Sequence, residues 1–168
     1  GTAITSGDGN VAVGSYALDA NTTAGANTAV GYMAMGANTT GANNTGLGHE
    51  ALLAATTANS NTAVGKEAGK ALTTGAENTV IGGSALMTNT TGTQNVAVGY
   101  EALQLSTTSG NNTAVGHRAL ENTTTGADNT SVGRNALNAN TTASYNTAVG
   151  SIALDANTTG ANNTAVGY

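Results

Sequence analysis

The two histidines are the side chains of this sequence that are best suited to metal chemistry. His49 and His117 each directly follow a glycine and lie far apart in the sequence. Imidazole is a common metal ligand, but one chain brings only one histidine to each place, so a site would need copies from several parallel chains. The position after the glycine also holds Ser, Tyr, Lys and Arg elsewhere in the chain. We therefore expect solvated histidines and no metal or cofactor.

A pair of acidic residues could perform acid–base chemistry. Glu50 and Glu67 occupy equivalent positions in two successive copies of a sequence repeat, with Lys66 beside the second. If one repeat corresponds to one step between neighbouring strands, the two carboxylates lie about 5 Å apart, which is close to the separation in retaining glycosidases. A uniform array offers no pocket around them, however. We therefore favour a solvated face, with Lys66 relieving the repulsion, and expect no catalytic residue and no enzyme.

The element that must position these side chains is the repeat itself. The pattern N-T-A-V-G occurs ten times with small variations and at a constant interval. Such a period indicates a repeat architecture over residues 1–168 as a single array, which we expect to be a fragment of a longer fibre without caps. Each glycine that closes the pattern is numbered 17 higher than the one before it (31 − 14 = 17). These residues, called the closing glycines below, are Gly14, Gly31, Gly48, Gly65, Gly82, Gly99, Gly116, Gly133, Gly150 and Gly167.

Seventeen residues are too few for two helices and two turns, and Thr-Ala-Val alternates as a short strand does. The sequence predicts an all-β fold, a parallel β-roll or β-solenoid of ten 17-residue coils. We expect valine and the following Ala-Leu pair to point inward, the closing glycine to turn a corner with positive φ, and asparagine to form a ladder between coils. Representatives of these columns are Asn27, Val30, Gly31, Ala34, Asn61, Val64, Gly65, Asn112, Val115, Gly116, Ala119 and Leu120.

A core built from one coil of this kind is thin. About three apolar side chains per coil yield roughly 6–9 kcal/mol on burial, against on the order of 25 kcal/mol for ordering the whole coil. A column of small residues two before the closing glycine, such as Ala29, would permit another chain to approach closely. These features predict that the chain associates with itself, and we prefer an elongated homotrimer.

The units N-T-A-V-G-x-x-A-L resemble the head repeats of trimeric autotransporter adhesins. They resemble still more closely the 17-residue arrays of phage and phage-like tail fibres. The resemblance covers essentially the whole chain and implies a left-handed roll in a homotrimer, an extracellular, cell-surface or virion location, and a host glycan or protein receptor. It implies a structural or adhesive fibre module, a shaft or head segment.

The alternative function is ice binding by a β-solenoid that presents a threonine column. A Thr-Thr pair, Thr39-Thr40 in one copy, recurs at the eighth and ninth positions after the closing glycine. Adjacent strand residues point to opposite faces, so the pair offers one outward threonine per coil. Exposed tyrosines such as Tyr32 and Tyr100 could stack on sugars, although scattered surface tyrosines are common on fibres. Ten Asn-x-Ser/Thr motifs follow from the Asn- and Thr-rich repeat.

Composition excludes two kinds of partner. The net charge is −5, no basic patch is evident, and no apolar run approaches the roughly 20 residues of a membrane span. We therefore expect no nucleic acid and no membrane span in this segment.

One coil breaks the leucine column. Gly69 replaces the leucine, and Leu72 follows shortly after it. We expect the loop of this coil to rearrange so that Leu72 turns inward and fills the gap.

Overall fold

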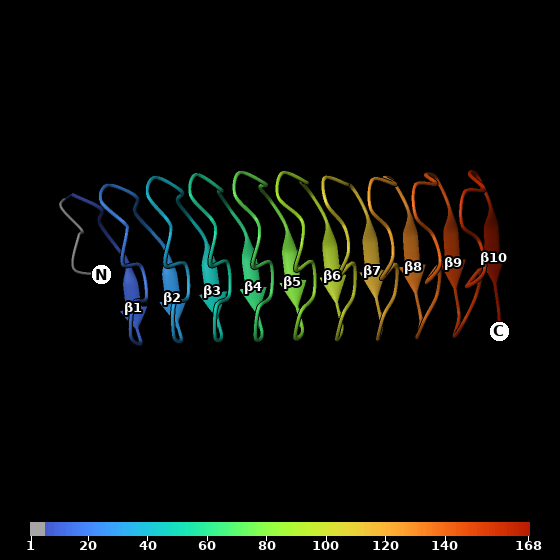
Figure 1. Cartoon of the computed structure of the whole chain (residues 1–168), viewed down its shortest axis with the longest axis horizontal. Coiled ribbons are helices and arrows are strands. Elements are labelled where there is room, and N and C mark those ends of the chain that lie inside the picture. The colour runs from blue at the N-terminus through green and yellow to red at the C-terminus, as the bar shows by residue number, and fades with distance from the viewer. Residues whose placement is uncertain (1–5) are drawn as a thin grey trace.

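The computed structural model describes residues 6–168, which form a β-solenoid whose coils stack side by side from the N-terminal to the C-terminal end (Figure 1). Within this range every strand is short and no helix occurs. The strands are β1 (Val11–Val13), β2 (Thr28–Val30), β3 (Thr45–Leu47), β4 (Thr62–Val64), β5 (Thr79–Ile81), β6 (Val96–Val98), β7 (Thr113–Val115), β8 (Thr130–Val132), β9 (Thr147–Val149) and β10 (Thr164–Val166). The described residues contain no helix that could cross a membrane.

All ten strands form one parallel sheet in sequence order, so each strand pairs with its neighbours in the chain. The register advances by one repeat at every step; Ala63, for example, pairs with Val80. The connecting segments are also hydrogen-bonded from coil to coil, as in the bond from the Leu52 N–H to the Ala68 carbonyl at 3.0 Å. A parallel in-register stack satisfies the backbone along much of each coil, which explains why the repeat tolerates no insertion.

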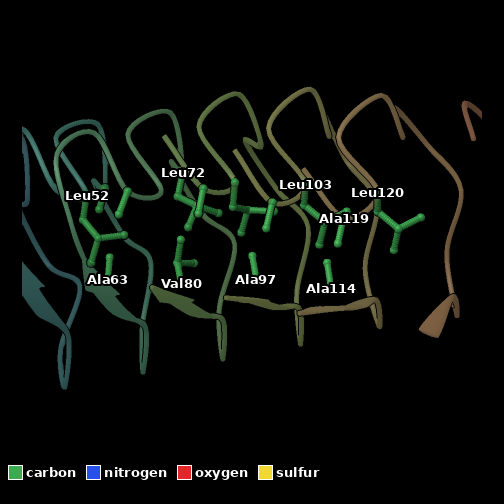
Figure 2. Packing of buried hydrophobic residues seen from close by; sticks show 14 of the residues in the cluster. Leu52, Ala63, Leu72, Val80, Ala97, Leu103, Ala114, Ala119 and Leu120 are labelled. Atoms are coloured by element: carbon green, nitrogen blue, oxygen red, sulfur yellow. The ribbon is translucent and has the colours of Figure 1, made fainter. Parts of the chain in front are cut away.

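The prediction that the valine column faces inward is wrong. In β2 to β9 the middle residue of the strand is buried and the first and third residues point outward. Ala29 and Ala63 have no exposed surface, whereas Val30 and Val64 are partly exposed. The column of small residues, expected to admit another chain, is therefore an inner wall of the solenoid. It is small where the leucine column packs against it from the opposite side of the coil (Figure 2), and its one larger residue, the buried Val80, occurs where Gly69 replaces the leucine.

The leucine column closes the core within one chain. Leu52, Leu103 and Leu120 have no exposed surface in the isolated chain, and the adjoining Ala119 is buried with them. The expectation that the Ala-Leu pair is inward is correct. Because this core is complete without a second chain, the argument for a trimer from a thin core loses its force.

The closing glycines and the asparagines build one corner of each coil. At Gly65 φ is 137°, and an added Cβ would lie 2.6 Å from the carbonyl oxygen of Gly82 in the next coil. The asparagine ladder passes through Asn44, whose backbone N–H and Nδ2 donate to Asn27 Oδ1 at 2.9 and 3.2 Å, and whose Nδ2 also donates to the Ala58 carbonyl at 2.7 Å. A buried amide with these partners holds consecutive coils in register.

The sequence did not reveal that three further positions in each coil adopt left-handed backbone conformations. They are the second, fourth and twelfth positions after the closing glycine; Leu52 has φ of 52° and Ile152 has φ of 55°. Residues with a side chain adopt this region at a cost of roughly 1–2 kcal/mol. These strained conformations persist only because the coils stacked around each turn hold its backbone in place.

Leu72 is buried, as predicted, but its loop does not rearrange. Gly69 has φ of 59°, close to that of the leucines, and the Leu72 N–H donates to the Gly69 carbonyl at 3.1 Å, as the Asn38 N–H does to Met35. The seventh position after the closing glycine points inward from coil to coil. Leu72 therefore fills the space with an unchanged backbone.

Candidate functional site

The outward side of the sheet is a uniform surface that carries no charged residue. We call it the sheet face; it consists of the first and third residues of β1 to β10. Its first positions hold only threonine or valine, and its third positions hold only valine, leucine or isoleucine. No charged residue occurs at any of these positions. Several of the aliphatic side chains are substantially exposed, including Val13 at 57%, Leu47 at 43% and Ile81 at 41%.

The sheet face therefore carries an apolar ridge along the whole stack. Apolar patches larger than a few hundred Å² are uncommon on soluble monomers and mark surfaces that are covered by a partner. Depletion of charge is also what distinguishes the buried centre of a protein interface. The predicted site residues Val30, Val64 and Val115 belong to this ridge.

The two residues of the Thr-Thr pair form two columns along the stack, and these columns differ in their surroundings. Thr39 is half-buried, and its hydroxyl donates to the Thr56 carbonyl of the next coil at 3.0 Å. The same bond recurs along the stack, for example from Thr56 to Thr73 at 3.2 Å. Thr40 and its counterparts are exposed. The first column thus stabilises the stack, and the second offers one outward hydroxyl per coil, as predicted.

The predicted tyrosines lie in short aromatic stacks on another edge of the solenoid. The rings of Tyr32 and His49 stack with centroids 5.2 Å apart, and Tyr16 contacts Tyr32 edge-on at 6.1 Å. Tyr100 and His117 stack in the same way at 5.7 Å. All these rings are exposed. The two histidines remain four coils apart, so the structure does not bring them together.

Beside each stack lies an ion-pair cluster. Lys70 Nζ lies 2.6 Å from Glu50 and 3.2 Å from Glu67, whereas Lys66 lies 3.9 Å from Glu67. The cation that relieves the acidic pair is therefore Lys70, not Lys66 as predicted. The hydrogen bond from Lys70, reinforced by its charge, lowers the pKa of Glu50.

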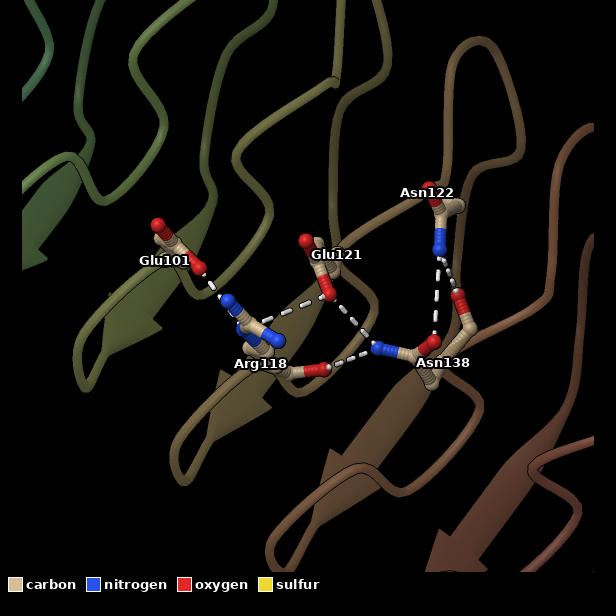
Figure 3. Close-up of polar contacts among 5 residues, drawn as sticks. All are labelled: Glu101, Arg118, Glu121, Asn122 and Asn138. Atoms are coloured by element: carbon tan, nitrogen blue, oxygen red, sulfur yellow. Dashed lines mark hydrogen bonds and ion pairs between the residues drawn. The ribbon is translucent and has the colours of Figure 1, made fainter.

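The second cluster likewise places one cation between two glutamates (Figure 3). Arg118 Nε lies 2.7 Å from Glu101 and 3.8 Å from Glu121, and Asn138 Nδ2 donates to Glu121 at 2.9 Å. Partial burial opposes ionisation of Glu101, but hydrogen bonds from Arg118 and Tyr100 outweigh it and lower the pKa of Glu101. The hydrogen bond between Tyr100 and Glu101 also raises the pKa of Tyr100.

A higher-order repeat that sequence reasoning missed links these clusters. The residues that directly follow the closing glycines read, in chain order, Ser15, Tyr32, His49, Lys66, Gly83, Tyr100, His117, Arg134, Ser151 and Tyr168. The series Tyr, His, cation, small residue repeats with a period of four coils. Aligning this one column at four times the basic repeat period would have revealed it.

No pocket occurs in residues 6–168, and no three His, Cys, Asp or Glu side chains in this range are grouped so that they could hold a metal ion.

The remaining predicted structural residues lie as follows. Asn61 and Asn112 belong to the buried asparagine ladder, Gly31 and Gly116 turn corners with positive φ, and Ala34 is buried in the core.

Comparison of the chain with known protein families, characterised proteins and solved structures finds no match.

Proposed function

We propose that this chain is a structural and adhesive fibre module, a shaft or head segment of a trimeric surface adhesin or a phage-like tail fibre. The supporting observation is the uncharged sheet face, which runs the length of the stack with an apolar ridge along it. Every coil contributes the same kind of residue to it, as a surface that is covered along its whole length requires.

Parallel association of chains about a common axis is the arrangement that fits such a ridge. Cyclic symmetry presents the same stripe of every chain to the axis, so one column of valines serves all chains. Three chains and a left-handed coil are what the resemblance to adhesin-head and tail-fibre repeats implies. The location proposed is a cell surface or a virion tail, and the module acts by extension and attachment rather than by catalysis.

The mass in solution tests this proposal. Sedimentation equilibrium should give three times the chain mass of 16.2 kDa. A monomer with a complete β circular-dichroism spectrum would contradict the trimer. The parallel, in-register stacking of the coils does not depend on this result, because the leucine core closes within one chain.

Ice binding is a second candidate function. It is favoured by the two outward columns of the sheet face, the first and third strand positions, rather than by the Thr-Thr pair. A monomer that produces thermal hysteresis and facets ice crystals would favour this function. Replacing Thr62 and Thr113 with lysine should then abolish the effect. The fibre proposal predicts no hysteresis.

A further inference from the structure

The basic residues of the chain are confined to two patches. The chain has four Lys or Arg residues and two His residues. One patch holds His49, Lys66 and Lys70, and the other holds His117, Arg118 and Arg134. Each patch also contains two glutamates, so its Lys, Arg and Glu charges cancel. Since four of the nine acidic residues lie in the patches, the other five (9 − 4 = 5) account for the net charge of −5.

Each patch presents one row of side chains along the axis of the stack, which we call a stripe. Stripe 1 is Tyr32, His49 and Lys66; stripe 2 is Tyr100, His117 and Arg134. Successive members come from successive coils and are therefore separated by about 5 Å. The two stripes lie four coils apart, or about 19 Å.

The members of a stripe keep polar groups free for a ligand. Lys66 has a side chain that is 69% exposed and only a distant acidic neighbour at 3.9 Å. Arg134 is exposed and forms no ion pair within residues 6–168. Because the aromatic rings stack on each other, a ligand would meet their exposed edges and the imidazole nitrogens. The Tyr100 hydroxyl already donates to Glu101, so in stripe 2 its oxygen can serve a ligand only as an acceptor.

We propose that the two stripes bind a carboxylated polysaccharide that lies along the solenoid. A uronate-type sugar has groups that match each member of a stripe. Its apolar C–H groups and hydroxyls would contact the edges of the Tyr and His rings, and its carboxylate would pair with the cation one coil further along. The glutamates beside each stripe can accept hydrogen bonds from sugar hydroxyls and disfavour a densely charged polyanion. An open surface without a pocket in the described residues suits an extended polymer rather than a small ligand.

Repetition at four coils supplies a second binding event for the same polymer. A polysaccharide that reaches both stripes binds more tightly than one that occupies either stripe alone, because the second contact is intramolecular. The inference rests on the adhesive part of the proposed function and deepens it by giving the class of receptor. Polysaccharide binding does not depend on the number of protein chains. A solution mass that contradicts the trimer would therefore not contradict this inference, and absence of polysaccharide binding would not contradict the trimer.

The test compares polygalacturonate with uncharged dextran and with dextran sulfate, by biolayer interferometry at low ionic strength. The variant Lys66→Ser/Arg134→Ser removes both stripe cations, and His49→Ser/His117→Ser removes both imidazoles. Both should fold, because Ser15 and Ser151 occupy this repeat position naturally. The matched control for the cation variant, Ser60→Glu/Asn111→Asp, lowers the net charge equally on a different column, where Glu77 and Asp128 occur.

Wild type should bind polygalacturonate in preference to both comparison polymers. Each stripe variant should weaken binding at least about tenfold, which corresponds to about 1.4 kcal/mol. The control should remain within about twofold of wild type, and circular dichroism should be unchanged in all variants. Absence of binding, preference for dextran or dextran sulfate, or equal loss in the control would each overturn the proposal.

Discussion

Exchanging the residues at positions 69 and 72 tests whether the core of each coil has a fixed volume. Leu72 is fully buried, and an added Cβ at Gly69 would lie 3.1 Å from Leu72 Cδ1 and 3.1 Å from Leu52 Cδ2. Leu72 therefore occupies the space that a leucine at position 69 fills in other coils. Removing it by Leu72→Ala leaves a void that no other side chain of the coil can fill.

The cost should fall in the upper part of the range for Leu→Ala, about 3–5 kcal/mol. The void cannot collapse, because backbone bonds tie this coil to the next at the Gly69 N–H (3.0 Å to Ala85) and the Thr73 N–H (2.9 Å to Thr90). Asn38→Ala at the equivalent position is the control. It removes one hydrogen bond to the Gly41 carbonyl, which Asn27 Nδ2 still reaches at 2.8 Å, so about 1 kcal/mol is expected.

A double-mutant cycle sharpens the test. Gly69→Leu alone overpacks the coil by about 1–3 kcal/mol, and Leu72→Asn alone leaves the void. The cycle is made in a Val80→Ala background, because Ala148 is the wall residue at the equivalent place for Leu137. There the two substitutions together restore the pattern of the coil that contains Leu137 and Asn140, and stability should return to within about 1 kcal/mol of the Val80→Ala background. The free energy of unfolding is measured by urea titration with circular dichroism. Additive effects of the two substitutions, or equal near-zero effects of Leu72→Ala and Asn38→Ala, would refute the shared volume.

The remaining predictions concern the corners, the left-handed positions and the ion pairs. Gly65→Ala should destabilise the fold by at least about 2 kcal/mol, because its φ is 137° and its Cβ would meet the Gly82 carbonyl. Gly83→Ala should be nearly neutral, since only the Tyr100 ring lies near, at 3.4 Å; similar thermal-unfolding midpoints for the two would contradict this. Ile152→Asn should stabilise the fold by about 0.5–1 kcal/mol in the same assay, because a β-branched residue is strained at φ of 55° and asparagine is tolerated; a loss of stability would argue that Ile152 packs. Since Lys70 lowers the pKa of Glu50, this carboxylate stabilises the fold above its ordinary pKa and the contribution is lost as pH falls through the lowered value. The midpoint should therefore fall less steeply below about pH 5 in Lys70→Ala than in wild type, and parallel curves would exclude the contribution.

The constant repeat period was sufficient to predict the parallel solenoid, because each coil must present the same surface to the next. The positive φ of the closing glycines, the asparagine ladder and the inward Leu72 also followed from local chemistry. The direction of the valine column did not. In so short a strand the alternation allows either Ala29 or the pair Thr28 and Val30 to face inward, and hydrophobicity alone favours valine. The deciding factor is the bulk of the opposing leucine column, which leaves room for a small residue in most coils and for Val80 only where Gly69 replaces the leucine.

The candidate site was predictable only in part. Tyr32 and Tyr100 were expected on the surface, but their histidine neighbours come from the next coil and become adjacent only when the stack is built. Likewise Lys70, at the fifth position after a closing glycine, reaches back to Glu50 in the preceding coil at 2.6 Å. Contacts across coils depend on the direction in which each side chain leaves the backbone, which the repeat period does not specify.

The central claim is that the sheet face is buried between copies of the chain, and the mass of a sheet-face variant tests it most directly. Val64→Glu/Val115→Glu places two charges on the apolar ridge without touching the leucine core. Sedimentation equilibrium should give three times 16.2 kDa for wild type and 16.2 kDa for the variant, with the β circular-dichroism spectrum retained in both. A wild type that is already monomeric, or a variant that keeps the mass of the wild-type assembly, would contradict the account.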